Sequence, residues 1–127
     1  MSVVLASVAF WAAARLTLVG DLGKPEVVDF KVRFKRLKTS ERKQLEAELA
    51  AKKITDKEFL DRLLVDWELK DKAGNSVPYT EQQRAELVED WDGFEAALAE
   101  AYFDNGRKAR EAVEVAKNSE PPSATTT

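Results

Sequence analysis

Residues 28–35 read VDFKVRFK, and this alternation decides how the first third of the chain folds. Apolar and charged side chains alternate along the whole stretch. Because successive side chains of a β-strand point to opposite faces, the apolar residues share one face and the charged residues share the other. The stretch therefore predicts a strand with one face against a core and the other in water.

A second strand is predicted at residues 15–19 (RLTLV), which are rich in apolar and β-branched side chains. Gly20, Gly23 and Pro25 separate the two strands and favour a turn between them. The pair predicts an antiparallel hairpin with one wet face, joined by a connection longer than the tightest hairpin turns.

Two helices are predicted after the hairpin. Thr39 or Ser40 is expected to cap the first. The second has a stronger start, because Thr55 and Glu58 form the sequence pattern of a capping box. Its apolar side chains recur at helical spacing, so it is expected to run to about residues 67–69. This apolar stripe is Phe59, Leu60, Leu63, Leu64 and Trp67.

Two further helices are predicted beyond a turn at residues 71–77. Thr80 and Gln83 repeat the capping-box pattern and start a helix that runs to about residue 90. Asp92 is expected to cap the last helix, with Glu95 in its first turn. Its apolar stripe is Phe94, Leu98, Ala101 and Tyr102, and it resumes at Ala109, Val113 and Ala116.

The pair Asn105 and Gly106 interrupts the last stripe. Glycine inside a helix costs about 1 kcal/mol relative to alanine, so the helix either runs through or breaks there. The predicted fold class is α+β, mainly α: an N-terminal β-hairpin followed by four or five helices. At 127 residues the chain has the length of one domain, predicted over residues 1–118. Residues 119–127 (SEPPSATTT) predict a disordered tail.

The chain contains no cysteine and no histidine. Disulfides, thiolate nucleophiles, imidazole bases and the usual zinc sites are therefore excluded, and no glycine-rich phosphate loop is present. Glu89, Asp90 and Asp92 around Trp91 form the densest acidic cluster, but neighbouring side chains point different ways, which favours a solvated helix junction over a metal or acid–base site. We expect no catalytic residue, no metal and no cofactor, and hence a protein that is not an enzyme.

The first 14 residues are apolar, but they are too short to span a membrane. No charged residue precedes Arg15, so the positive start of a secretory signal is missing. We therefore expect a buried N-terminal segment, no membrane association and a cytoplasmic protein.

Charge is distributed unevenly along the chain. Residues 24–43 carry eight basic and three acidic side chains, whereas residues 81–104 carry eight acidic side chains and one arginine. This asymmetry suits docking on a charged partner or self-association. The alternative is that the two segments face each other within the fold.

The sequence distinguishes between two kinds of partner, nucleic acid and protein. Nucleic acid is disfavoured, because strand geometry places Phe30 and Phe34 on the face opposite their basic neighbours, and the pI is near 5.2. A protein partner would contact exposed aromatic side chains, and the candidates are Phe30, Phe34, Trp67 and Trp91. The alternative for each of these four is packing in the core.

Taken in order, several segments resemble the tail assembly chaperones of long-tailed phages, which are similar in role to the lambda G-type protein. The resemblance spans about residues 15–118 and is carried by VDFKVRFKRL (28–37), by DKEFLDRLLVDWELKDKAGNSVPYTEQQRAELVE (56–89) and by ALAEAYFD (97–104). It implies a phage or prophage protein that binds the long, aggregation-prone tape measure protein in the bacterial cytoplasm, recruits tail tube subunits, and is absent from the finished virion.

The same resemblance implies a longer second product made by programmed −1 frameshifting. The codons for Ala116, Lys117 and Asn118 are compatible with the slippery heptamer A AAA AAC. The longer product made by frameshifting there would recruit the tail tube protein. The alternatives to a chaperone are a small nucleic-acid-binding phage or bacterial regulator and a small enzyme.

Overall fold

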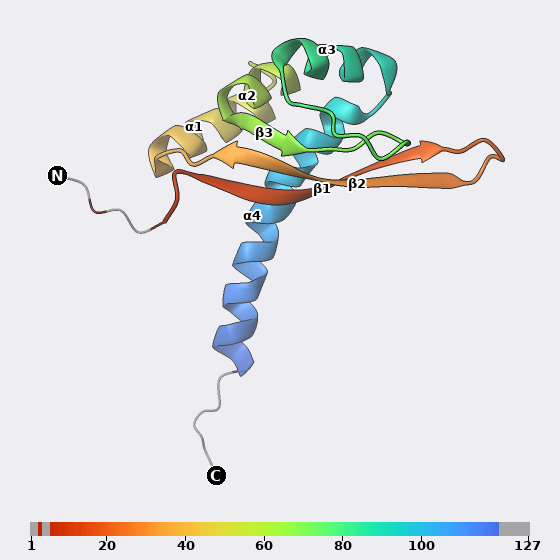
Figure 1. The fold of residues 1–127 in the computed structure, drawn as a ribbon. Coiled ribbons are helices and arrows are strands. Elements are labelled where there is room, and N and C mark those ends of the chain that lie inside the picture. Colours follow the sequence, from red (N-terminus) through yellow and green to blue (C-terminus); the bar gives the residue numbers. More distant parts are fainter. Residues whose placement is uncertain (1–2, 4–5, 120–127) are drawn as a thin grey trace.

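The computed structural model describes residues 3 and 6–119, and the predicted disordered tail lies outside the described residues from residue 120 onward. Strands and helices follow one another in a mixed order (Figure 1). The elements are β1 (Ala9–Val19), β2 (Pro25–Lys35), α1 (Thr39–Ala50), α2 (Asp56–Leu63), β3 (Leu64–Glu68), α3 (Glu81–Asp90) and α4 (Phe94–Ser119).

The predicted hairpin is confirmed and is longer than expected. β1 begins at Ala9, so part of the apolar N-terminal segment is strand. It pairs antiparallel with β2 in one unbroken register, from Ala9 opposite Lys35 to Val19 opposite Pro25. Only alternate residues of this stretch are buried, which corrects the expectation of a buried N-terminal segment.

The predicted fold class, a mainly α fold with a hairpin followed by four or five helices, is wrong, because the described residues form a three-stranded antiparallel sheet and four helices, with 46% helix and 27% strand. α2 ends at Leu63, and residues 64–68, predicted as helix, form β3 beside β2. The register shifts between Arg33 and Phe34, so that Phe34 pairs with Leu64 and Arg33 with Asp66.

This bulge explains why the sequence pattern was misleading. One extra residue on the bulged strand has no direct partner, and the residues beyond it change face. Leu64 and Trp67, three residues apart, can therefore both be buried, and three is also a helical spacing. Val65 and Trp67 have high β-propensity, and β2 offers an unpaired edge, so both factors favour a strand at residues 64–68.

The start of α2 agrees with the sequence pattern, and the start of α1 does not. At α2, Thr55 Oγ1 accepts from the Glu58 backbone N–H (3.2 Å) and the Glu58 carboxylate accepts from the Thr55 N–H (3.0 Å), which confirms the capping box. α1 is instead capped at Lys38, whose backbone N–H donates to the Glu41 carboxylate. Neither Thr39 nor Ser40 fills that position.

Of the two later helices, α3 starts as the sequence predicts and α4 starts later. Thr80 Oγ1 accepts from the Gln83 backbone N–H at 2.9 Å, as predicted. α4 begins at Phe94, and Gly93, at φ +87°, accepts the bond from the Ala97 N–H, so the start lies later than Asp92. The helix runs without a break through residues 105–106.

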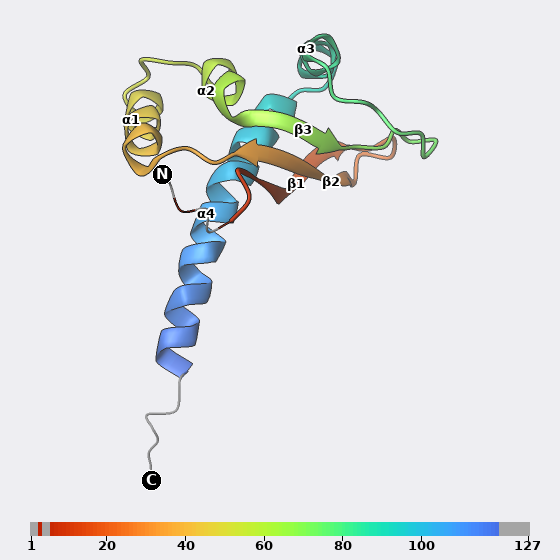
Figure 2. The same cartoon turned by 60° about the vertical axis from the view of Figure 1, so that its left-hand side comes forward.

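The core lies between one face of the sheet and the helices α2 and α4, which cover that face (Figures 1 and 2). Phe30 stacks on Phe94 with ring centroids 5.7 Å apart, and Phe34 meets Tyr102 edge-on at 5.3 Å. These contacts join the central strand to α4. The other face of the sheet carries charged side chains, and none of the helices in the described part of the chain covers it (Figures 1 and 2).

Leu98 of α4 is fully buried against this sheet, whereas Leu22 at the hairpin turn is 86% exposed. We predict that Leu98→Ala lowers the free energy of unfolding by about 2–5 kcal/mol, because it removes buried methyl groups and leaves a cavity. Leu22→Ala is the matched control and should change it by less than about 0.5 kcal/mol. Urea titration followed by circular dichroism measures both; equal effects would contradict this assignment of the core.

Candidate functional site

Three of the four aromatic residues predicted as partner contacts lie in the core. Phe34 has no exposed surface, and Phe30 and Trp67 are 6% and 4% exposed. The Trp67 indole N–H donates to the backbone oxygen of Val77 at 2.7 Å, so its polar group is satisfied within the chain. Trp91 is 48% exposed and is the one of the four that a partner can reach without opening the core.

The acidic cluster around Trp91 is exposed. Glu89, Asp90 and Asp92 lie where α3 ends and α4 is about to begin, with their side chains in solvent. Within the part of the chain that the structure describes, no group of three or more acidic, histidine or cysteine side chains is placed to hold a metal ion. The arrangement is that of a solvated helix junction.

The two oppositely charged segments do not neutralise each other through ion pairs. Among residues 3 and 6–119, no ion pair joins a side chain of residues 24–43 to a side chain of residues 81–104. Arg84 is the basic member of the acidic segment and is 5% exposed; it bonds to Asp61 at 2.9 Å and to the Lys57 backbone oxygen at 3.1 Å. Both charged surfaces therefore remain available to a partner.

A large, mainly apolar hollow lies beside the far half of the hairpin, and we call it the hairpin groove. It encloses about 1100 Å³ between the hairpin, the loop at residues 70–72 and the start of α4. Its apolar lining is Leu16, Leu18, Val19, Val27, Val28, Trp91 and Phe94. Asp21, Glu26, Asp29 and Asp71 against Lys70 and Lys72 make its rim slightly acidic.

The hairpin groove exists because the hairpin is longer than the layer of helices. An 11-residue strand is about 36 Å long, and two packed helices cover about 20 Å of it. The far half of the hairpin extends beyond α4 (Figure 1). The apolar face therefore continues past its cover at Leu18 and Val28, which are half-buried, whereas Val19 and Val27 belong to the opposite face of the sheet and are 83% and 47% exposed.

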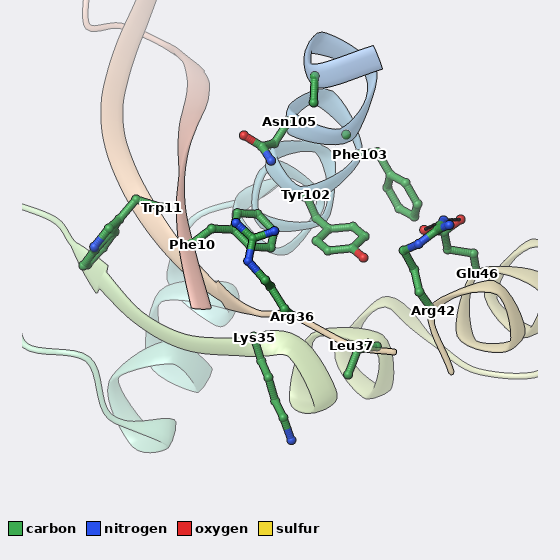
Figure 3. Close-up of a pocket in the computed structure, with 12 residues that line it drawn as sticks. Phe10, Trp11, Lys35, Arg36, Leu37, Arg42, Glu46, Tyr102, Phe103 and Asn105 are labelled. Atoms are coloured by element: carbon green, nitrogen blue, oxygen red, sulfur yellow. Dashed lines mark hydrogen bonds and ion pairs between the residues drawn. The ribbon is translucent and has the colours of Figure 1, made fainter. Parts of the chain in front are cut away.

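A second hollow, the aromatic cleft, lies at the opposite end of β1 between α1 and α4 (Figure 3). It encloses about 510 Å³, with Phe10, Tyr102 and Phe103 on its walls. The Arg36 guanidinium lies 5.1 Å from the centre of the Phe10 ring, and its Nε donates to the Ser7 backbone oxygen. Lys35 points away from the cleft.

The electrostatics of the aromatic cleft centre on Tyr102. Burial raises the pKa of the Tyr102 hydroxyl above its ordinary value, and the negative charge of Glu46 raises it further, while Arg42 opposes this shift. Arg42 itself is paired with Glu46 at 3.2 Å. Because both arginines of the cleft already have partners within the chain, the hairpin groove is the stronger candidate for a binding site.

Neither hollow was recognised in the sequence. The hairpin groove joins β1 and β2 to Trp91, more than 60 positions further along the chain. The available signal was the alternation itself, because the apolar residues Leu18 and Val28 continue the core-facing side of both strands almost to the turn.

Comparison of the chain with protein-family models, curated proteins and solved structures finds no match. Of the helices that the structure describes, none has the length and apolar character needed to cross a membrane.

Tyr102 provides a test of the aromatic cleft. In a Tyr79→Phe background, absorbance at 295 nm reports its ionisation, and we predict a midpoint above the ordinary tyrosine pKa of about 10. Glu46→Gln should lower that midpoint, because it removes a negative charge that disfavours the tyrosinate. A group whose folded pKa is raised stabilises the fold below its unfolded pKa and loses this contribution as pH rises through the folded pKa. A midpoint at or below the ordinary value would contradict the geometry.

Proposed function

We propose that this chain is a tail assembly chaperone of a long-tailed phage or prophage, acting in the bacterial cytoplasm and absent from the finished virion. Its task would be to bind the tape measure protein and to help recruit tail tube subunits. The observation that supports a binding function is the hairpin groove, whose apolar lining includes the half-buried Leu18 and Val28 and the exposed Trp91.

The groove suits an amphipathic helix of a partner. Such a helix presents apolar anchors at positions i, i+3, i+4 and i+7 to an apolar surface. Fully burying one large aliphatic side chain is worth about 1.5–3 kcal/mol, so completing the burial of Leu18 and Val28, both half-buried in the groove, offsets part of the entropy lost on association. Trp91 at the edge adds an aromatic anchor of the kind that interfaces favour. A long helical protein with exposed apolar faces supplies ligands of this type.

A nucleic-acid regulator is less well supported. Phe30 and Phe34 are buried, so they cannot stack on bases. The opposite face carries Arg15, Lys31, Arg33 and Lys35. Arg15 is paired with Asp29 at 2.8 Å, and Asp66 and Glu68 lie opposite Arg33 and Lys31, so this mixture of signs is not the basic footprint that phosphate binding requires.

The frameshifted product would extend from a distinct part of the molecule. Residues 116–118 fall in the last turn of α4, which points away from the sheet (Figure 2). A segment added there would be held apart from the hairpin groove, so that one product could hold the tape measure protein and a tube subunit at once. The gene sequence tests this proposal: an AAG codon for Lys117 would remove the slippery site.

Binding to the tape measure protein is tested with two matched valines. Val28 lies in the hairpin groove on the core-facing side of β2, whereas Val88 lies on α3 outside the groove, and both are half-buried against the core. We predict that Val28→Glu weakens co-purification with the tape measure protein encoded beside this gene by at least about tenfold, because a charge must lose its hydration in the groove. Val88→Glu should leave co-purification unchanged.

The same experiment can reject the proposal. Equal loss in both variants, or no binding by the wild-type chain, would exclude the hairpin groove as the binding site. Circular dichroism of each variant separates lost binding from lost folding. A shift of duplex DNA by the purified chain at physiological salt would favour the regulator instead.

A further inference from the structure

β1 is an edge strand whose outer side has no partner in the described chain. The sheet order is β1-β2-β3, so β1 pairs only with β2. The Arg36 N–H donates to the Val8 oxygen and the Gly20 N–H to the Lys24 oxygen. These two bonds show which residues of β1 form hydrogen-bonded pairs with β2. Even-numbered residues of β1 therefore bond to β2, and odd-numbered residues direct their N–H and C=O groups outward. These are Ala9, Trp11, Ala13, Arg15, Thr17 and Val19.

This edge lacks the features that keep strands apart. Exposed edges are normally protected by charged side chains, by proline or by bulges. β1 contains no proline, Arg15 is its single charged residue, and its register with β2 has no bulge over 11 residues. Three consecutive alanines at residues 12–14 also leave room for another backbone to approach.

α4 supplies a platform beyond the edge. It crosses the strands on the core side and continues past β1, as both views show (Figures 1 and 2). Its 26 residues correspond to about 39 Å, whereas three strands at about 4.8 Å spacing span only about 10 Å between the outer two. A hollow of about 360 Å³ lies along the edge and is lined by Ala13 and Ala14 of β1 and by Ala97 and Ala101 of α4.

We propose that β1 of one copy pairs antiparallel with β1 of a second copy, giving a six-stranded sheet across a two-fold axis. The second copy's β1 would lie over the projecting half of the first copy's α4, and the reverse. An added strand needs apolar cover on its core side, and the projecting helix offers Ala109, Ala112 and Val115, all exposed in the single chain. The proposal does not depend on the identity of any tape measure partner.

Charge on α4 selects a second copy as the occupant. Glu100 and Asp104 lie where the helix passes the edge, and Arg107 and Lys108 follow them. Under a two-fold axis the two α4 helices run antiparallel, and acids of each then face bases of the other. An isologous interface requires this self-complementarity. Asp104 and Arg107 already pair at 3.2 Å within the helix, but both are about half-exposed and can exchange partners.

Single cysteines test the pairing, because the chain has none of its own. Cysteine replaces Trp11, Ala13, Arg15 or Thr17 one at a time, and a short bifunctional thiol reagent is added. Opposed residues of antiparallel strands have Cα atoms about 4.5–5.5 Å apart, so variants nearest the two-fold axis should give covalent dimers. Lys31→Cys is the control, because Lys31 lies opposite Ala13 on the same face but in the central strand.

The N–H groups themselves are tested with proline. Thr17→Pro and Ala13→Pro each remove one outward donor, and Thr17→Val and Ala13→Val retain it. By symmetry each proline removes two intermolecular bonds, so the dimer dissociation constant from light scattering should rise at least about tenfold, with no change for valine. Glu100→Lys should weaken the dimer, and Glu100→Lys combined with Lys108→Glu should restore it.

Three results would overturn the proposal: a wild-type chain that stays monomeric at every concentration, cross-linking of Lys31→Cys as efficient as that of the β1 variants, or a dimer unaffected by proline. Circular dichroism shows whether each proline variant folds. Should both proline variants unfold, the cysteine series alone decides between the edge dimer and a monomer. Loss of the dimer with tape measure binding intact would leave the proposed function standing, and the converse would leave the dimer standing.

Discussion

The burial of one face of β2 is the constraint on which the rest of this structure depends. Val32 and Phe34 have no exposed surface, and a register shift of one residue would exchange them for Arg33 and Lys35. The cost of placing those charges in the core fixes the register of the whole sheet. Phe34 meets Tyr102 edge-on, and this contact helps to set where α4 crosses the strands.

Both surfaces left open follow from that crossing. The helices lie across strands that are longer than the helical layer is wide, so the far half of the hairpin keeps an uncovered apolar face. α4 is in turn longer than the sheet is wide, so it passes beyond the edge of β1. The first mismatch produces the hairpin groove, and the second produces a platform beside unpaired backbone groups.

Local patterns predicted the elements whose stabilising contacts are close in sequence. Thr55 and Glu58, three residues apart, predicted the start of α2, because the side chain of each accepts a hydrogen bond from the backbone N–H of the other. At residues 64–68 the local pattern was ambiguous, because Leu64 and Trp67 fit a helical stripe and a bulged strand equally well. The partner that resolved this ambiguity is β2, 30 positions earlier in the chain.

The sequence by itself determined the hairpin, its wet and dry faces and most of the helix positions, because alternation and capping are properties of neighbouring residues. It also excluded chemistry that needs a thiol or an imidazole. Only the tertiary structure decided that Phe30 and Trp67 are core while Trp91 is reachable, and that β1 is an edge. Burial and strand order depend on which distant segments cover a residue, and no local spacing carries that information.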